Sequence, residues 1–323
     1  MLSDPTLFLA RRTMPTGMSA RTPIPDTDLT SPPELPPNAF AQMSETGTVQ
    51  LSVIVPVLNV GRTIGQTLAG VLSENRPDVE LIVVDGGSTD NTRTICEKWG
   101  ARLVAHVSRR STARRIGAEL ARGEFLLFLD GDQVPGPGLL EECVVRTRTE
   151  AIDALKIPEL DSAFGFWAGA RRLDRFASTS EETTYPRLFR RTVYFSVGGH
   201  RSDLEDYMED RDLFLRLRQR GFGWSWSRSS VFNLIGEINP LEIGIKGARS
   251  AQDSASYYRM RQSLKSDLQV VVVARLRALA RAIQSGASLG DVCLLLPYTV
   301  VAYGPRLVAI LTSKSGAQTT PRH

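Results

Sequence analysis

Short apolar runs that alternate with stretches of helical periodicity constrain this chain more than any other feature of its sequence. The runs begin at Leu51, Val79, Leu103 and Phe125, and each has the length of a buried strand. After the first run, the apolar residues of 64–72 recur at helical spacing. Such alternation at short intervals predicts an α/β fold, with a mostly parallel central sheet and helices on both of its faces.

Polar residues stand just past the carboxyl ends of these expected strands. Asn59 follows the first run, Asp85 closes the second, and Asp130 and Asp132 follow the fourth. In open α/β sheets the ligand crevice lies outside the carboxyl ends of the strands. We therefore expect these side chains to gather at one edge of the sheet.

The segment Asp130-Gly131-Asp132 has the pattern of a cation site. Two carboxylates at this spacing on a loop can hold Mg²⁺ or Mn²⁺ together with diphosphate oxygens, and Gly131 lets the backbone approach a ligand closely. The cation would neutralise charge on a departing diphosphate. The alternative interpretation is a surface turn, for which Asp-Gly is an ordinary signal.

A glycine-rich segment, Val84 to Asp90, follows the second expected strand. Asp85 can accept hydrogen bonds from a base or a ribose, and free backbone N–H groups can face phosphate. The alternative is an ordinary loop in which Thr89 or Asp90 caps the next helix. We expect both interpretations to hold in part, with Asp90 in a structural role.

Two acids begin an expected helix that runs from Glu209 to Arg220. Leu213 and Leu217 lie one helical turn apart and would anchor this helix to the core. A carboxylate held at its N-terminal end could take the proton from an acceptor hydroxyl. The alternative is a set of surface acids that the helix dipole favours.

Three arginines stand close together in a segment rich in aromatic residues. Arg171, Arg172 and Arg175 could grip an acceptor phosphate through paired N–H groups. The alternative is the solvated face of a helix.

The C-terminal region is basic and partly apolar. Nine Lys and Arg residues stand against two acids from Arg259 to His323, which predicts an anionic partner such as a membrane surface or a phosphorylated lipid. The uncharged stretch 292–305 is shorter than the ~20 residues of a membrane-spanning helix. We expect a peripheral attachment to the membrane. The alternative is a pair of helices that pack on the domain or form a homodimer contact.

Composition excludes several other classes of protein. The three cysteines are scattered and lack CxxC spacing, which argues against a disulfide framework or a zinc site and fits a reducing compartment. No basic stripe with interleaved aromatic residues accompanies a nucleic-acid-binding motif, so no nucleic-acid partner is expected. Residues 1–48 hold eight of the 18 prolines, which predicts a disordered tail.

Four sequence motifs in this order resemble family 2 glycosyltransferases, which have the Rossmann-like GT-A fold. The motifs are Pro56-x-x-Asn59, VVDGGSTDNT, STARRIGAELARGEFLLFLDGDQ, and GGH followed by EDRDLFLRLRQRG. Together they cover about residues 50–235. The resemblance implies an inverting transfer from a nucleoside-diphosphate sugar by direct displacement at the anomeric carbon.

The resemblance also implies roles for single residues. Asp210 matches the catalytic base, and Glu209 is its neighbour in the motif. Asp130 and Asp132 match the metal motif. The residues that match the nucleotide-sugar site are Pro56, Val57, Asn59, Asp85, Ser88, Arg114, Asp130 and Gly131.

The chain departs from the family pattern at three places. Gly86 stands where the family often has a second acid, which contacts the base in some members. Asn233 and Glu237 are the nearest matches to a histidine that helps to bind metal or diphosphate in many members. Val60 replaces the usual acid after the asparagine of the first motif.

These observations predict a GT-A catalytic domain at residues 49–235, a helical extension at 236–313 and a flexible tail at 314–323. The expected function is metal-dependent transfer of a sugar to a glycan hydroxyl or a polyprenyl or lipid phosphate, in the cytoplasm at the inner face of the membrane. The alternatives are a nucleotidyltransferase that uses a sugar phosphate, a non-catalytic module that binds nucleotide sugars, and a membrane scaffold.

Overall fold

A computed structural model describes residues 48–179, 181, 183–204, 208–239, 242–245, 248, 280, 283–284 and 287–312. The expected terminal tails, 1–48 and 314–323, lie outside this part of the chain apart from residue 48. Of the basic region from Arg259 to His323, the described residues are 280, 283–284 and 287–312.

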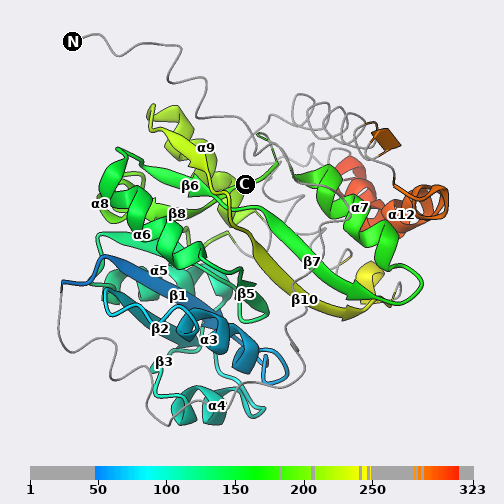
Figure 1. The fold of residues 1–323 in the computed structure, drawn as a ribbon. Helices are drawn as coiled ribbons and strands as arrows, with labels where there is room; N and C mark the ends of the chain where they lie inside the picture. The colour runs from blue at the N-terminus through cyan, green and yellow to red at the C-terminus, as the bar shows by residue number, and fades with distance from the viewer. Residues whose placement is uncertain are drawn as a thin grey trace, which may run out of the picture.

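The largest element is a seven-stranded sheet in the order β3-β2-β1-β4-β8-β6-β9 (Figure 1). All neighbouring pairs are parallel except those that involve β8, which runs antiparallel to β4 and β6. The prediction of a mostly parallel sheet is confirmed. The strands are β1 (Leu51–Val57), β2 (Val79–Asp85), β3 (Arg102–Ala105), β4 (Phe125–Phe128), β6 (Ala154–Lys156), β8 (Pro186–Arg190) and β9 (Trp224–Trp226).

The strand register brings the predicted polar residues to one edge of the sheet. Val57 at the end of β1 pairs with Asp85 at the end of β2, and Ile54 pairs with Phe128 at the end of β4. The loops that follow these three strands therefore leave the sheet side by side.

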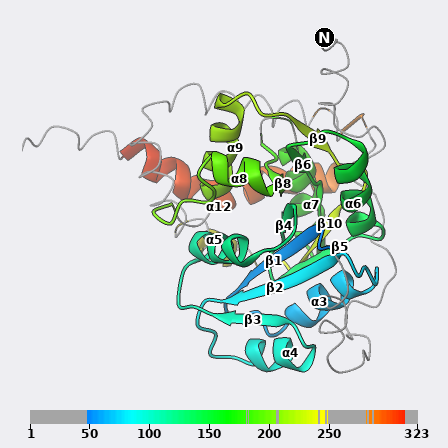
Figure 2. The same ribbon diagram turned by 90° about the vertical axis from the view of Figure 1, so that its left-hand side faces the viewer.

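Helices cover both faces of this sheet, as predicted (Figure 2). Successive strand residues point to opposite faces, and the buried side chains divide accordingly into two clusters. One cluster packs under α3, α4 and α6, and the other packs under α5, α8 and α9. The helices are α3 (Ile64–Leu72), α4 (Thr92–Lys98), α5 (Arg110–Leu120), α6 (Leu139–Thr149), α8 (Arg191–Ser196) and α9 (Glu209–Gln219).

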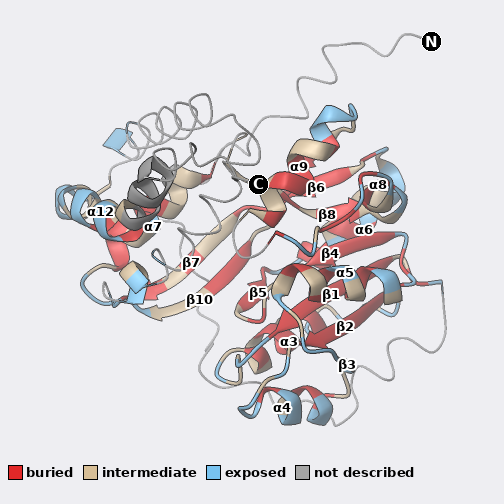
Figure 3. Cartoon of the chain, turned by 180° about the vertical axis from the view of Figure 1, so that it is seen from behind, coloured by how far each residue is buried: buried red, intermediate tan, exposed pale blue. Residues whose placement is uncertain are grey.

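The central strands are buried along their length, whereas α4 is largely exposed (Figure 3). All seven residues of β1 and all seven of β2 are buried. Strands covered on both faces have no solvent-facing side, which explains why their sequences read as continuous apolar runs rather than as alternating patterns.

A smaller sheet, in the order β5-β10-β7, lies beside the main one. Its strands are β5 (Gln133–Pro135), β7 (Glu159–Phe164) and β10 (Val231–Glu237), and helices α7 (Ala168–Ser178) and α12 (Leu289–Thr312) pack beside it. A third apolar cluster joins these elements, with Tyr298 and Ala302 of α12 among its buried members. β10 continues two residues past the expected domain boundary at residue 235, and that boundary stays a prediction.

Some local features of the structure are not apparent from the sequence pattern. Helix α5 begins at Arg110, so Arg109 takes its capping position and Ser111 lies inside the helix. In the smaller sheet, β5 has only three residues and β7 mixes polar with apolar residues, so periodicity alone does not reveal these two strands. Among the described residues, no helix combines the length and apolar character that crossing a membrane requires.

Candidate functional site

A cavity of about 740 Å³ opens at the edge where β1 and β4 end. Its walls come from the β1–α3 loop, the N-terminal end of α5, the loop after β4, the N-terminal end of α9, and the smaller sheet with α7 and α12. Pro56, Val57, Asp130, Asp132 and Asp210 all line it. Residues from distant parts of the sequence thus meet at the predicted edge of the sheet.

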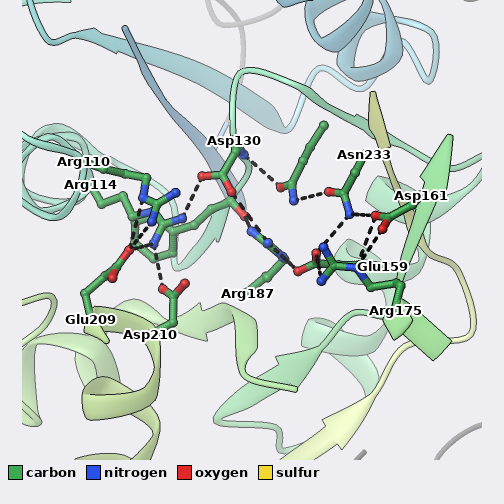
Figure 4. Close-up of polar contacts among 12 residues, drawn as sticks. Arg110, Arg114, Asp130, Glu159, Asp161, Arg175, Arg187, Glu209, Asp210 and Asn233 are labelled. Carbon is green, nitrogen blue, oxygen red and sulfur yellow. Dashed lines mark hydrogen bonds and ion pairs between the residues drawn. The ribbon is translucent and has the colours of Figure 1, made fainter. Parts of the chain in front are cut away.

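Arg114 joins the two acidic motifs from a buried position beside this cavity (Figure 4). Its Nη2 donates to Oδ1 of Asp130 at 2.7 Å, and its Nη1 donates to Oδ1 of Asp210 at 2.7 Å. The Arg114 side chain is 1% exposed. A buried guanidinium needs carboxylate partners, so the position of Arg114 on α5 brings together two carboxylates that lie far apart in the sequence.

Glu209 is a third carboxylate that binds Arg114. Its side chain is fully buried, and its Oε1 accepts hydrogen bonds from Arg114 Nη1 at 3.3 Å and from Arg110 Nε at 3.1 Å. Glu209 is thereby committed to two arginines of α5. It anchors the start of α9 and leaves its neighbour Asp210 at the surface of the cavity.

Asp210 presents one free oxygen to the cavity. Within the described part of the chain, Arg114 and His200 both contact Oδ1, whereas Oδ2 has no hydrogen-bond partner. The side chain is about one third exposed. This geometry is that of a carboxylate that can accept a proton from a bound molecule.

The arginines keep these acids ionised. Burial by itself raises the pKa of Asp130 and of Asp210, but the adjacent Arg114 guanidinium, helped by Arg187, outweighs burial and holds both pKa values well below the usual range. Burial likewise opposes the charge of Arg114, and the three carboxylates around it raise its pKa nonetheless. Arg114, Asp130 and Asp210 are therefore charged at neutral pH.

The glycine-rich loop after β2 is held by contacts within the loop region itself. Asp85 Oδ1 accepts hydrogen bonds from the backbone N–H and the hydroxyl of Ser88, and Asn59 Oδ1 accepts one from the backbone N–H of Thr89. Asp90 accepts the backbone N–H groups of Thr92 and Gly61, as expected of a structural residue.

Asn59, Asp85 and Ser88 lie outside the cavity lining. The Asp85 side chain is 1% exposed, and its Oδ2 is buried without a hydrogen-bond partner among the described residues. A buried oxygen left in this state is uncommon. Its charge is met by Arg93 instead, whose Nε lies 3.6 Å from Oδ2, beyond hydrogen-bond distance.

Gly131 occupies a tight place rather than an open one. A Cβ at this position would lie 2.8 Å from Cγ2 of Val60. Thr63 and Thr67 both donate to its carbonyl oxygen. The glycine is thus required by the packing of the β1–α3 loop, in addition to any approach of a ligand.

A second polar network runs from the loop after β4 to the smaller sheet (Figure 4). The backbone N–H of Asp130 donates to Gln133, whose amide donates to Asn233 Oδ1 at 2.7 Å. Asn233 donates in turn to Asp161 at 2.6 Å and to Glu159 at 3.2 Å. Asn233, the nearest match to the histidine of the family pattern, therefore acts as a hydrogen-bond bridge.

The three arginines of α7 do not share one environment. Arg171 and Arg175 line the cavity and bind Asp161, and Arg175 also binds Glu159. Arg172 is exposed, lies outside the cavity lining, and donates to the carbonyl oxygen of Ala163 at 2.9 Å. Only the first two remain candidates for contact with an acceptor.

Several functional candidates escaped the sequence analysis. Arg187 sits between Asp130 and Glu159. Burial raises the pKa of Glu159, but Arg187 and Arg175 outweigh that effect and lower the pKa to about 2. Arg187 and Glu159 lie on β8 and β7, with no motif around them. His200 is the histidine of the GGH motif, and the rarity of histidine in this chain was the available signal.

The donor set at Asp130 and Asp132 fits a hard divalent cation only in part. Within the described residues no group of three or more His, Cys, Asp or Glu side chains is placed to hold a metal. Asp130 is already bound by Arg114, whereas Asp132 lines the cavity. Because Mg²⁺ is commonly held by one or two carboxylates together with substrate phosphates, these residues fit a cation that arrives with a diphosphate.

Comparison with known proteins identifies the family of the segment that carries Arg114, Asp130 and Asp132. Residues 52–208 match the model of glycosyl transferase family 2. These residues form a family 2 glycosyltransferase domain. The resemblance drawn from the motifs is thereby confirmed.

Curated relatives of this glycosyltransferase domain are named glycosyltransferases. The glycosyltransferase GlyG of Streptococcus pneumoniae is 26% identical over 112 residues, which are 32% of this chain and 37% of the relative. The PGL/p-HBAD biosynthesis glycosyltransferase of Mycobacterium tuberculosis is 30% identical over 166 residues, which are 46% of this chain and 61% of the relative. The chain thus spans between about a third and three fifths of these two relatives.

The fold also matches that of a solved glycosyltransferase. The mannosyltransferase PcManGT of Pyrobaculum calidifontis, solved in complex with GDP-Man and Mn²⁺, aligns with a TM-score of 0.55 over 90% of this chain and 92% of its own. The two sequences are 17% identical, so this likeness concerns the fold. The predicted GT-A fold is confirmed.

Proposed function

We propose that this chain is an inverting glycosyltransferase that moves a sugar from a nucleoside-diphosphate sugar to an acceptor, with the help of Mg²⁺ or Mn²⁺. The observation that carries the proposal is the buried Arg114, which binds Asp130 of the donor motif and Asp210 of the base motif at one cavity. A donor held at Asp130 and an acceptor held at Asp210 would face each other across that cavity.

Charge balance favours a cation that accompanies the donor. Six arginines stand in or directly behind the cavity wall, against six carboxylates. They are Arg109, Arg110, Arg114, Arg171, Arg175 and Arg187, against Asp130, Asp132, Glu159, Asp161, Glu209 and Asp210. A diphosphate would add negative charge to a balanced site. Asp132, beside Asp130, would hold the divalent cation, which supplies positive charge to the leaving diphosphate.

Asp210 acts on the acceptor in this proposal. Its Oδ2 would accept the proton of an acceptor hydroxyl as the hydroxyl oxygen attacks the anomeric carbon. Arg114 holds Oδ1 and keeps the group ionised before the attack. An attack from the side opposite the diphosphate inverts the anomeric configuration. A lipid phosphate acceptor is already anionic, and Asp210 would then orient it rather than deprotonate it.

The acceptor end of the cavity combines guanidinium groups with apolar side chains. Arg171 and Arg175 line it together with Ile235, Ile243 and Ala302. Arg171 Nη1 also donates to the hydroxyl of Tyr298 on α12 at 3.0 Å. These residues would receive a glycan or a lipid-linked acceptor.

The proposal includes a peripheral contact of the C-terminal region at the inner face of a membrane, or with a second copy of the chain. Leu289, Leu296 and Val300 recur along α12 at helical spacing, and they are 79%, 72% and 62% exposed. The opposite side of α12 packs on the domain through Tyr298 and Ala302. An apolar face of this kind is typical of an interaction surface.

The proposal is tested by turnover of a panel of nucleotide sugars, with and without Mn²⁺, in the presence of glycan and polyprenyl-phosphate acceptors. The expected product is a nucleoside diphosphate, whereas a nucleotidyltransferase would release pyrophosphate from a nucleoside triphosphate. Asp132→Ala should remove the stimulation by Mn²⁺. A donor that raises the melting temperature without any turnover would instead indicate a binding module.

Asp210→Asn separates the two acceptor classes in the same assay. With a hydroxyl acceptor, loss of the base should lower kcat by roughly 10²- to 10⁴-fold. With a phosphate acceptor the loss should be mild. Asp203→Asn is the matched control, because Asp203 is 58% exposed and lies outside the cavity lining. A wild-type rate in Asp210→Asn with a hydroxyl acceptor would refute the base role.

A further inference from the structure

A buried tyrosine and histidine stand behind Asp210. Tyr194 of α8 is fully buried and His200 is 1% exposed. The Tyr194 hydroxyl lies 2.9 Å from His200 Nδ1, and His200 Nε2 lies 3.1 Å from Oδ1 of Asp210. The three side chains thus form a line of hydrogen bonds that ends at the cavity.

The direction of each hydrogen bond in this line is fixed by its members. The backbone N–H of His200 donates to the Tyr194 hydroxyl oxygen at 3.0 Å, because a backbone N–H can only donate. Burial raises the pKa of Tyr194 to about 12, so the hydroxyl keeps its single proton. At the other end of the line the ionised Asp210 can only accept, so Nε2 of a neutral ring donates to it and the hydroxyl donates its proton to Nδ1.

The ring of His200 is therefore protonated on Nε2. Burial lowers the pKa of His200, against the opposing effect of Asp210, so the ring is neutral and carries one proton. Because Nδ1 accepts from Tyr194, that proton is on Nε2, where it points at the carboxylate of Asp210. The other neutral tautomer would place a nitrogen lone pair against a carboxylate oxygen.

Packing holds the ring in this plane. Phe128 of β4 meets the His200 ring edge to face, with centroids 4.9 Å apart. The turn before His200 needs two glycines with positive φ, at 92° and 60°, and a Cβ on Gly199 would lie 2.8 Å from the Tyr194 ring. Arg216 of α9 donates to the carbonyl of Gly199 at 2.7 Å, which ties the turn to the helix that carries Asp210.

We propose that Tyr194 and His200 are positioning residues of the transfer reaction, and that Tyr194 selects the His200 tautomer whose Nε2–H holds Oδ1 of Asp210. Oδ2 is then left toward the acceptor. His200 takes no proton during transfer, since its Nε2 is already protonated. The proposal rests on the proposed base role of Asp210, and its spectroscopic part does not depend on turnover.

The tautomer is read directly from side-chain ¹⁵N NMR of the histidine-labelled full chain at pH 7. The His200 signals are those that disappear in His200→Gln. The expected pattern is an unprotonated Nδ1 and a protonated Nε2, and Tyr194→Phe should shift it toward the other tautomer. A wild-type ring protonated on Nδ1, or a pattern unchanged by Tyr194→Phe, would overturn the relay even if no substrate is known.

Kinetic measurements test whether the hydrogen bonds from Tyr194 to His200 and from His200 to Asp210 support the transfer reaction. A glutamine places its amide nitrogen about where His200 Nε2 stands, whereas an asparagine reaches only as far as Nδ1. His200→Asn should lower kcat roughly 10- to 100-fold, as expected for loss of one hydrogen bond to a charged group. His200→Gln should stay within about threefold of the wild type, and the donor KM should be unchanged in both.

A double mutant separates tautomer selection from packing. Glutamine has no tautomer to select, so Tyr194→Phe should lower kcat in the wild-type background and have no further effect in His200→Gln. Thermal unfolding of each variant reports the cost to stability separately. Equal effects of Tyr194→Phe in both backgrounds, or equal activity of His200→Asn and His200→Gln, would show that these residues only support the fold.

Discussion

Particular arginines stabilise the ionised state of individual carboxylates in this molecule. Glu159 is the clearest case, because Arg187 and Arg175 both bind it and Asn233 donates to it. The partners of Asp130 and Asp210 act in the same way. Ion pairs in a partly buried site are costly to break, because the remaining partner is left buried and unpaired.

Stability should therefore fall in acid, and Glu159 should account for part of the loss. Its pKa is about 2 in the folded chain against an ordinary 4.5, so its contribution is complete above pH 4.5 and is lost as the pH falls toward 2. The contribution is on the order of 3 kcal/mol. Urea unfolding from pH 7 to pH 3 should show a falling free energy of unfolding, and Glu159→Gln should flatten that fall.

Glu119→Gln provides the control for this experiment. Glu119 lies on the exposed side of α5, with its side chain 51% exposed. Its substitution should leave the pH profile of the wild type almost unchanged. A Glu159→Gln profile that is as steep as the wild-type profile would contradict the assignment.

Helix α5 decides how closely the site is assembled, because it carries Arg110 and Arg114 on one side and packs against β1 on the other. The close approach depends on Gly117. A Cβ at this position would lie 2.4 Å from Cγ2 of Ile54, in the fully buried strand β1. A larger residue would push the helix, and with it Arg114, away from the sheet.

Gly117→Ala should therefore destabilise the fold, although alanine favours helices. The helix propensity gain is about 1 kcal/mol, and overpacking should outweigh it for a net loss of roughly 1–2 kcal/mol. Gly304→Ala in α12 is the matched control, since a Cβ there meets no described atom within 4 Å. That variant should be neutral or more stable. Equal melting temperatures for the two variants would contradict the packing argument.

At the scale of the whole molecule, the cavity lies where two sheets and α12 meet. The main sheet supplies Asp130, α5 and α9 supply Arg114 and Asp210, and the smaller sheet supplies Glu159. Because α12 contributes Tyr298 to the cavity and an exposed apolar face to the surface, it places the acceptor end beside the surface that is proposed to meet a membrane.

The full chain is expected to sediment with vesicles rich in anionic phospholipid, and Leu296→Asp should weaken this binding about tenfold or more. The reason is that an exposed leucine buried at the interface contributes roughly 1.5–3 kcal/mol. Val145→Asp is the control, because Val145 is exposed on α6, away from α12. A dimer in light scattering that Leu296→Asp dissociates, without any vesicle binding, would assign the face to a second copy.

The sequence by itself determined the main sheet and the polar residues at its edge. Strands buried on both faces must be continuously apolar, and the parallel order brings their carboxyl ends to one edge, so the positions of Asn59, Asp85 and Asp130 follow from local patterns alone. The motifs in addition identified Asp210 and Arg114. Both residues stand in sequence patterns that a short stretch of chain can carry, because Asp210 lies at the start of helix α9 and Arg114 lies on helix α5.

Only the tertiary structure decided which of these residues meet, and through which ion pairs and hydrogen bonds. Arg114 and Asp210 are 96 residues apart and in contact, Glu159 and Asp161 lie on a short strand without a recognisable pattern, and Arg172 faces away from its two neighbours on the same helix. Ion pairs and hydrogen bonds between distant segments depend on the angle at which helices and sheets pack. That angle is set by many side chains together, and no local stretch of sequence encodes it.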